Sequence, residues 1–251
     1  MTKTILITGA TSGFGKSIAE HFAADGWNLI LVGRRSERLR VISAELGEKV
    51  AVLPITLDVR QRQAVMETLT NLPENFNAVD VLVNNAGLAA GLEPAQSADL
   101  DNWDAMVDTN IKGLMYVTRA ILPGMVARNT GHIVNIGSVA GSYPYEGGNV
   151  YGATKAFVAQ FSRNLRSDVS GTAIRVTNIK PGNAETEFSL VRFKGNVAKA
   201  KAVYQGYQPL TAEDIAEMVF WVTHLPAHVN VNELEVMPVA QSWAGYKIHR
   251  H

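Results

Sequence analysis

The chain contains no cysteine, which excludes disulfide bonds, thiolate metal sites and a thiol nucleophile. It also lacks an excess of either charge, because 23 Lys and Arg residues balance 23 Asp and Glu residues. Nucleic-acid-binding domains usually carry a basic excess, so we expect no nucleic-acid partner. The six histidines are scattered and form no paired metal-ligand motif, so we expect no metal site.

Long apolar segments are absent as well. No run approaches the roughly 20 apolar residues that span a bilayer, so we expect no membrane partner. The N-terminal segment lacks the charged and apolar regions of a secretory signal, which predicts a cytoplasmic protein. Apolar residues make up 47% of the 251 residues, enough to build one sizeable core.

Short apolar segments alternate with amphipathic ones along the chain. Helical spacing of apolar residues marks segments 16–24 and 36–46. The segments that read as buried strands are 4–7, 29–32, 50–55, 79–83, 133–136 and 175–179. This alternation predicts an α/β fold, with a doubly wound parallel sheet and helices on both faces. We predict one domain over residues 1–251, with an irregular substrate-side insertion at about 183–210 and a C-terminal tail at about 240–251.

A glycine-rich loop joins the first predicted strand to the first predicted helix. Its glycines would allow a tight turn, close approach of the backbone to a pyrophosphate, and close packing of helix on strand. The helix N-terminus would add oriented N–H groups and a positive dipole end. A tight turn alone needs similar residues, but the position after the first strand favours a dinucleotide site. We predict cofactor contacts from Gly9, Thr11, Ser12, Gly13, Phe14 and Gly15.

The second predicted strand ends in two arginines, Arg34 and Arg35, where a site for NAD often has an acidic residue. A guanidinium group can pair bidentately with a 2′-phosphate, and the Ser12 hydroxyl could assist it. This pattern predicts NADP(H) as cofactor, although a solvated helix start would also explain the arginines. Weaker cofactor signals follow the third and fourth predicted strands, at Asp58, Val59, Asn85, Ala86 and Gly87.

Tyr151 and Lys155 stand four residues apart, which places both on one face of a helix. An ammonium group near a phenol stabilises the phenolate and lowers the phenol pKa, so Tyr151 could exchange a proton with a carbonyl oxygen. Ser138 could hold the same oxygen by a hydrogen bond. Asn110 could position a water beside Lys155 as a proton relay. The tyrosine–lysine pair alone is unspecific, and the ordered set of motifs is what favours catalysis.

Together these motifs resemble the short-chain dehydrogenase/reductase superfamily over nearly the whole chain. The resemblance implies a Rossmann-type fold, a catalytic tetrad of Asn110, Ser138, Tyr151 and Lys155, and contacts of Tyr151 and Lys155 with the cofactor. It also implies that Ile179 and Thr186 flank the nicotinamide and its carboxamide, beside the Pro181-Gly182 pair. The further cofactor contacts it implies are therefore Pro181, Gly182 and Thr186.

A closer resemblance is to the NADP-dependent 3-hydroxy acid dehydrogenases and the related sulfoacetaldehyde reductases. It is carried by residues 84–88 (NNAGL), 122–125 (LPGM), 147–156 (GGNVYGATKA), 191–195 (VRFKG) and 225–230 (LPAHVN). It implies an oxidoreductase acting on the CH–OH/carbonyl pair of a small anionic aldehyde or hydroxy acid. It also implies a homotetramer or homodimer, in which Tyr246 of the C-terminal segment could serve a neighbouring subunit's pocket.

The substrate loop departs from the pattern of the 3-hydroxy acid dehydrogenases. Residues 181–188 (PGNAETEF) are shorter than usual and contain Asn183. This difference favours reduction of sulfoacetaldehyde to isethionate over the alternative, a 3-hydroxy acid dehydrogenase for malonic semialdehyde, serine or allo-threonine. Arg192 could meet a carboxylate or a sulfonate. The predicted substrate contacts are Ser138, Tyr143, Tyr145, Asn149, Tyr151, Asn183, Arg192 and Tyr246.

Two other classes remain open at this point. A non-catalytic NADP-binding sensor or scaffold could share the fold, because fold alone does not decide function. Such a protein would not need both Tyr151 and Lys155. An epimerase or dehydratase could share the tyrosine–lysine pair, but these enzymes often carry a separate substrate domain, for which this chain has no room.

Overall fold

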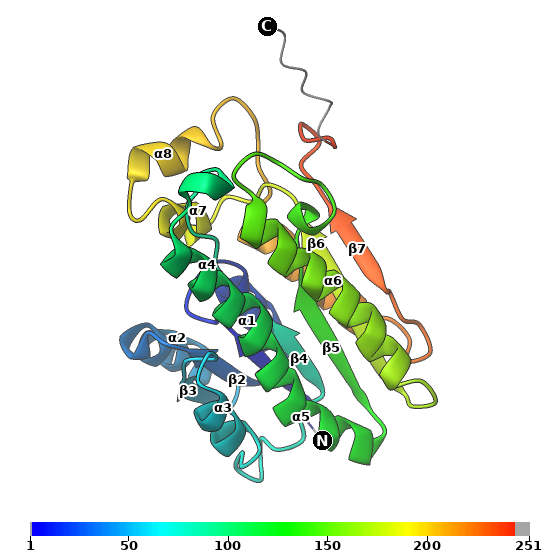
Figure 1. The fold of residues 1–251 in the computed structure, drawn as a ribbon. Coiled ribbons are helices and arrows are strands. Elements are labelled where there is room, and N and C mark those ends of the chain that lie inside the picture. The colour runs from blue at the N-terminus through cyan, green and yellow to red at the C-terminus, as the bar shows by residue number, and fades with distance from the viewer. Residues whose placement is uncertain (1, 244–251) are drawn as a thin grey trace, which may run out of the picture.

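The computed structural model describes residues 2–243, which contain one seven-stranded parallel sheet (Figure 1). The strands lie in the order β3-β2-β1-β4-β5-β6-β7, and every neighbouring pair is parallel. Their bounds are β1 Thr4–Thr8, β2 Asn28–Gly33, β3 Val52–Thr56, β4 Val81–Asn84, β5 Gly131–Ile136, β6 Ile174–Pro181 and β7 Glu233–Val236. The predicted fold class, a doubly wound parallel sheet of Rossmann type, is confirmed.

The first six strands coincide with the six predicted segments, with ends that differ by one or two residues. The centres of β1, β2, β4, β5 and β6 are buried and mainly β-branched and aliphatic, as expected for strands covered on both faces, whereas β3 lies at the sheet edge and none of its residues is buried. The seventh strand was not predicted. Its sequence, ELEV, alternates acidic and apolar residues, and all four residues are only half-buried at the edge of the sheet. A four-residue edge strand of this kind lacks the continuous apolar run that identified the others.

Two layers of helices cover the sheet. The core on one face is formed by α1, α2 and α9, and the core on the other face by α3, α5 and α6. The helices are α1 Gly13–Ala24, α2 Ser36–Gly47, α3 Arg62–Leu69, α4 Leu100–Val107, α5 Leu114–Arg128, α6 Asn149–Asp168, α7 Glu187–Arg192, α8 Val197–Ala202 and α9 Ala212–His224. Between residues 2 and 243, no helix is long and apolar enough to cross a membrane.

Three short turns of helix complete the described elements. A π-helical turn, Asp108–Gly113, lies between α4 and α5, and such bulges frequently mark functional sites. Two 3₁₀ turns span Ala95–Ser97 and Val139–Gly141. The segment predicted as irregular, 183–210, contains α7 and α8, which lie beyond the carboxyl ends of the strands (Figure 1).

The strand order reverses between β1 and β4. The chain moves from β1 outward to β2 and β3, and then returns to place β4 on the other side of β1. The loops after β1 and β4 therefore leave the sheet in opposite directions and open a crevice between them. Ligands of open α/β sheets bind at such a switch point, outside the carboxyl ends of the strands.

Candidate active site

A cavity of about 710 Å³ lies at the carboxyl ends of the strands. This volume falls within the range of cofactor and ligand sites. Its walls come from the glycine loop after β1, from the ends of β2 to β6, from α7 and from the segment after β7. The topology thus brings together the separate motifs that the sequence places after successive strands.

The glycine loop has a backbone that larger residues would not adopt readily. Gly9 and Gly13 have φ angles of +68° and +50°, in the left-handed region that favours glycine. A Cβ on Gly15 would lie 2.4 Å from the Gly9 carbonyl oxygen, so this position must also be glycine. Gly9 and Gly13 line the cavity, whereas Gly15 does not and instead packs the start of α1 against the loop. Gly15 was predicted as a cofactor contact, but it lies outside the cavity wall and has only the packing role of the motif's glycines.

The loop after β4 is held directly beside the glycine loop. The Asn85 side-chain amide donates to the Thr8 carbonyl oxygen at 2.9 Å, and the Ala86 N–H donates to the Thr8 hydroxyl at 3.0 Å. These bonds place Asn85, Ala86 and Gly87 in the cavity wall, as predicted for the cofactor site.

The two arginines after β2 have different surroundings. Both line the cavity. The Arg35 guanidinium donates to the hydroxyls of Thr11 and Ser12 and forms an ion pair with Glu187 of α7 at 3.0 Å. Within residues 2–243, Arg34 makes no hydrogen bond or ion pair. The free guanidinium group at this end of the cavity is therefore that of Arg34.

Asp58 and Val59 line the cavity after β3, as predicted. The Asp58 carboxylate is engaged by Arg60, with a shortest N–O distance of 2.6 Å. The hydrogen bonds from Arg60 hold the pKa of Asp58 below its ordinary value, so this carboxylate is charged at neutral pH. The predicted acceptor for an adenine amino group is thus present, but it shares its oxygens with a neighbouring guanidinium.

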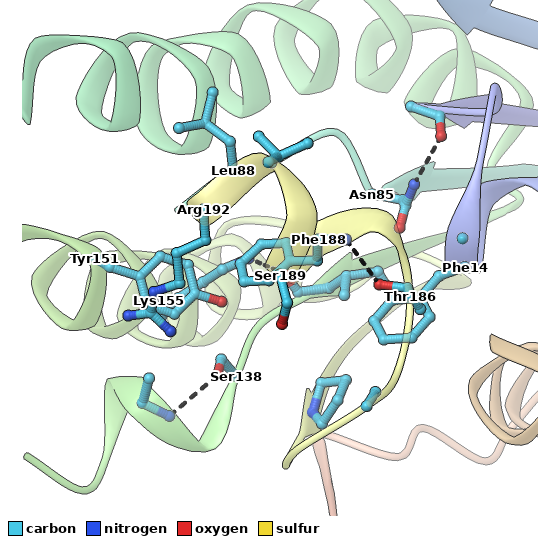
Figure 2. A pocket seen from close by; sticks show the side chains of 18 of the residues that line it. Phe14, Asn85, Leu88, Ser138, Tyr151, Lys155, Thr186, Phe188, Ser189 and Arg192 are labelled. Carbon is cyan, nitrogen blue, oxygen red and sulfur yellow. Dashed lines mark hydrogen bonds between the residues drawn. The ribbon is translucent and has the colours of Figure 1, made fainter. Parts of the chain in front are cut away.

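Tyr151, Lys155 and Ser138 meet at the inner end of the cavity, as Figure 2 shows. Tyr151 and Lys155 project from α6, and Ser138 follows β5. The Lys155 Nζ atom donates to the Ile136 carbonyl oxygen at 2.8 Å and lies 5.9 Å from the centre of the Tyr151 ring. The predicted spacing along α6 therefore does bring the phenol and the ammonium group together on one face.

The pKa values of this pair differ from the sequence expectation. Burial raises the pKa of Tyr151 to about 12, although a hydrogen bond with Ser138 and the charge of Arg192 act to lower it. Burial also lowers the pKa of Lys155 to about 8. We expected Lys155 to lower the tyrosine pKa, but desolvation outweighs every nearby charge. The phenol therefore carries its proton at neutral pH, and it can donate that proton only where positive charge stabilises the tyrosinate that remains.

Asn110 lies behind this pair, in the π-helical turn, and does not line the cavity. Its side chain donates to the Leu88 carbonyl oxygen at 2.8 Å and to the Thr154 hydroxyl at 3.0 Å, and it accepts from the Leu88 N–H at 2.9 Å. Asn110 thus ties the loop after β4 to α6. Its role in a proton relay stays a prediction.

The predicted substrate residues separate into two groups. Arg192 donates to the Tyr145 hydroxyl at 2.6 Å, and its guanidinium lies 5.6 Å from the centre of the Tyr151 ring. Tyr143 and Asn183 also line the cavity, but Tyr143 donates its hydroxyl proton to Glu235, and the Asn183 amide donates to Tyr207. Arg192 and Tyr145 are therefore the predicted donors that keep free N–H and O–H groups beside Tyr151.

Two predicted contacts are not found in the cavity wall. Asn149 lies outside the cavity lining, because its side-chain amide donates instead to the Glu93 carbonyl oxygen at 3.1 Å. Ile179 is fully buried in the core beneath the cavity, because it lies in the middle of β6. Tyr246 lies outside the described residues. Pro181, Gly182, Thr186 and Phe14 line the cavity as predicted.

Several lining residues were missed by the sequence reasoning. Phe188 packs its ring 5.7 Å from that of Tyr151, and Glu187 forms ion pairs with Arg35 and Arg38. Both belong to α7, and their place in the segment 181–188 could have indicated them. Tyr204 and Trp243 also line the cavity. No local motif identifies these two, because they reach the site only through the fold of the segments after β6 and β7.

The fold and the site together define a class of protein. A doubly wound sheet carries a glycine loop at its switch point, next to a buried tyrosine–lysine–serine group at the carboxyl ends of the strands. No group of three or more metal-ligating side chains exists in the part of the chain that the structure describes. The sheet, the glycine loop and the tyrosine–lysine–serine group together are typical of dinucleotide-dependent oxidoreductases.

Comparison with known proteins identifies the family. Residues 3–195 match the model of the short chain dehydrogenase family, and the chain belongs to that family. It is 60% identical to an NADP-dependent 3-hydroxy acid dehydrogenase from Salmonella typhi, over 98% of this chain and 99% of the relative. It is 54% identical to sulfoacetaldehyde reductase 2 from Chromohalobacter salexigens, over the full length of both chains.

The structural comparison agrees with these relatives. A serine dehydrogenase in its closed form, complexed with NADP+, is 57% identical and superposes with a TM-score of 0.95, covering 99% of this chain and 100% of the other. The prediction of an oxidoreductase acting on a CH–OH/carbonyl pair is confirmed. The predicted cofactor, NADP(H), is the cofactor named for the serine dehydrogenase complex and for the 3-hydroxy acid dehydrogenase.

Proposed function

We propose that this chain is an NADP-dependent 3-hydroxy acid dehydrogenase that interconverts a small carbonyl acid and its hydroxy acid. The observation that carries the proposal is the position of Arg192. Its guanidinium lies 5.6 Å from the Tyr151 ring, so a cation stands directly beside the proposed proton donor. A substrate with a carboxylate near its reactive carbon would meet both groups at once.

The residues of the cavity fit a dinucleotide. The glycine loop offers a cradle that side chains would fill, since a Cβ on Gly9 would lie 2.9 Å from the Asn85 amide nitrogen. Arg34 offers a free guanidinium group for a 2′-phosphate. The NADP named for the relatives supports the same choice of cofactor.

The chemistry divides between the cofactor and the protein. When bound, NADPH supplies a hydride to the carbonyl carbon of the substrate. Tyr151 donates its proton to the carbonyl oxygen as the hydroxyl group forms, and Ser138 holds that oxygen by a hydrogen bond. The positive charge of Lys155 stabilises the tyrosinate that remains. In the oxidative direction, Tyr151 accepts the proton from the hydroxyl group.

The donors around Tyr151 favour a carboxylate over a sulfonate. The Arg192 guanidinium and the Tyr145 hydroxyl supply donors for the two oxygens of a carboxylate. A sulfonate has a third oxygen to satisfy, and Tyr143 and Trp243 both donate to Glu235 instead. On this basis malonic semialdehyde and 3-hydroxypropionate, serine and allo-threonine are the favoured substrates.

Reduction of sulfoacetaldehyde to isethionate, which the sequence analysis favoured, is the second candidate in this proposal. It is supported by Asn183, whose amide nitrogen lies in the cavity wall and has one N–H left after its bond to Tyr207. That N–H could reach a third sulfonate oxygen. The 54% identity with sulfoacetaldehyde reductase 2 also supports it.

The deciding experiment compares steady-state rates of the wild-type protein with NADPH and malonic semialdehyde, sulfoacetaldehyde or propanal, which carries no charge. In the Arg192→Gln variant, we expect kcat/KM for the anionic aldehyde to fall by about 10- to 100-fold and that for propanal by much less. Arg175→Gln, which changes an arginine remote from the cavity, is the control.

Two results would count against this proposal. Equal losses on charged and uncharged aldehydes would show that Arg192 does not recognise the anion. A Tyr151→Phe variant that kept near-full reduction rates would exclude Tyr151 as the proton donor, whereas we expect a loss of at least about 100-fold.

A further inference from the structure

Helix α7 is fastened at its first residue to the opposite side of the cofactor cleft. Both carboxylate oxygens of Glu187 lie 2.8 Å from an Arg38 guanidinium nitrogen, and one of them lies 3.0 Å from Arg35. Arg38 belongs to α2, and Arg35 precedes that helix. Glu187 and Arg35 line the cavity, so these ion pairs join two parts of its wall, the segment after β2 and the segment after β6.

Arg35 has little capacity left for a ligand. Its Nε and one terminal nitrogen donate to the Thr11 hydroxyl at 2.9 and 2.6 Å, and that same nitrogen donates to the Ser12 hydroxyl at 2.7 Å. Its other terminal nitrogen donates to Glu187. Arg35 thus connects the glycine loop with α7, whereas Arg34 has no such partner within the described chain.

We propose that Glu187, Arg35 and Arg38 form an ionic clasp that holds α7 over the bound dinucleotide and slows its release, while Arg34 alone recognises the 2′-phosphate. This inference rests on the proposed NADP-dependent function. The three clasp residues are positioning residues, since they act through the placement of α7. The proposal gives the two arginines after β2 different tasks: Arg35 positions α7, and Arg34 binds the 2′-phosphate.

The other residues of α7 and its cap contact the cofactor loop and the proposed catalytic tyrosine. Thr186, which caps the helix, packs beside the glycine loop, where a Cβ on Gly13 would lie 3.4 Å from it. Phe188 packs against Tyr151, and Arg192 at the last position reaches Tyr151 and Tyr145. A helix of six residues that is tied at both ends must release the Glu187 end before a dinucleotide can leave past it.

The size of the effect is limited by exposure. The side chains of Arg35, Arg38 and Glu187 are between 42% and 48% exposed, so each ion pair is partly screened by solvent. Half-exposed ion pairs contribute little individually, and several charges in one network contribute more. We therefore expect loss of the clasp to speed dinucleotide release by about fivefold.

A different role for Glu187 predicts the opposite sign. If its carboxylate competed with the 2′-phosphate for Arg35, removing the charge would tighten NADPH binding and leave NADH binding unchanged. The clasp requires faster release of both dinucleotides by the same factor, because α7 covers the cleft whichever one is bound.

The test is a stopped-flow measurement of NADPH and NADH dissociation, followed by nicotinamide fluorescence without substrate. Glu187→Gln and Arg38→Ala should each release both dinucleotides about fivefold faster. The double variant should be no faster than Glu187→Gln alone, because that substitution already removes the ion pair between Glu187 and Arg38. Glu37→Gln is the matched control, since this carboxylate also pairs with an arginine of α2 but faces solvent. Added salt should speed release from wild type and have little effect on Glu187→Gln.

Arg34→Ala completes the design. It should weaken NADPH binding strongly and leave NADH binding nearly unchanged. Release rates in Glu187→Gln equal to wild type, or selectively tighter NADPH binding, would overturn the clasp. A wild-type protein that bound neither dinucleotide would overturn the proposed function itself, so the two failures are distinguishable.

Discussion

Tyr151 and Lys155 are both almost fully buried, and burial moves their pKa values in opposite directions. The pKa of Tyr151 rises to about 12, and that of Lys155 falls to about 8. Each shift favours the neutral form of its group, because a low-dielectric site penalises charge. The phenol keeps its proton at neutral pH, while the ammonium group is held close to the pH at which it loses its charge.

This pair predicts a pH dependence for the reductive reaction. The pKa of Lys155 is lowered from 10.5 to about 8, so the group is charged below pH 8 and neutral above it. The reaction leaves a tyrosinate that needs the Lys155 charge, so we expect kcat/KM for reduction to fall as pH rises through about 8. The measurement is a pH profile of initial rates with NADPH and a small aldehyde.

Two variants separate Lys155 from other titrating groups. Lys155→Arg keeps its charge at all working pH values and should lose the decline above pH 8, even though its rates will be lower. Lys112→Met changes an exposed lysine of the π-helical turn and should keep the wild-type profile. A wild-type profile that stayed flat to pH 9.5 would contradict the assignment.

The glycine loop is the element on which the cofactor site depends. Its path requires the positive φ angles of Gly9 and Gly13 and the close approach of Gly15 to the Gly9 carbonyl. Because the start of α1 rests on that carbonyl, one Cβ at Gly15 would push the helix N-terminus away from the cavity.

Gly15→Ala therefore should damage both binding and stability. The new Cβ would lie 2.4 Å from the Gly9 oxygen and 2.6 Å from the Asn85 amide nitrogen. We expect a loss of about 1–3 kcal/mol in the free energy of unfolding, as for other overpacked sites, and at least about tenfold weaker NADPH binding. Chemical denaturation and fluorescence titration would measure the two effects.

Gly47→Ala is the matched control for this prediction. Gly47 is the last residue of α2, and a Cβ there would meet nothing within 4 Å. We expect this variant to be neutral or more stable by up to about 1 kcal/mol, since alanine restricts the unfolded chain. Similar losses in both variants would mean that crowding at Gly15 is not the cause.

At the scale of the whole molecule, the sheet buries several polar side chains among its aliphatic ones. His132 of β5 is one of them, and its Nε2 lies 2.8 Å from the Thr177 hydroxyl of β6. Desolvation, with a smaller contribution from Arg175, lowers the pKa of His132 to about 3. The His132 ring therefore stays neutral in the folded protein between about pH 3 and pH 6.5, where the unfolded chain protonates it.

His132 makes the stability of the fold depend on pH. Between about pH 3 and pH 6.5 the unfolded state binds a proton at His132 and the folded state does not. Stability therefore rises with pH across this window, by up to about 1.4 kcal/mol per pH unit. We expect His132→Gln to show a shallower dependence in urea denaturation measured from pH 4.5 to 7.

The control for His132 is a histidine on the surface. His228→Gln, at an exposed position after α9, should keep the wild-type slope. The slope and not the absolute stability carries the test, because either substitution can change the free energy of unfolding at a single pH. An unchanged slope in His132→Gln would refute the assignment.

Four further sequence predictions stay predictions. They are the homotetramer or homodimer, the single domain over residues 1–251, the cytoplasmic location and the role of Tyr246.

The fold class and most of the site were determined by the sequence itself. Five buried strands could be predicted because residues covered on both faces must be continuously apolar, and the edge strand β3 because its sequence is mainly apolar. Each motif stands directly after the strand that positions it. Three of the site's features are local patterns with local physical causes. They are the positions of Gly9 and Gly13, the two arginines after β2, and the spacing of Tyr151 and Lys155. These features needed no knowledge of which segments meet.

Only the tertiary structure decided the burial and the hydrogen-bond partners of those residues. Burial depends on the whole chain, so the pKa of Tyr151 moved opposite to the direction expected from Lys155 alone. Hydrogen-bond partners likewise come from distant segments. The Tyr143 hydroxyl donates a hydrogen bond to Glu235 of the unpredicted strand β7, and a terminal nitrogen of Arg35 donates to Glu187 of α7. Long-range contacts of this kind distinguish side chains that the sequence alone makes equally good candidates for binding a ligand. They leave Arg34 without a partner in the described chain and leave Arg192 with unused N–H groups.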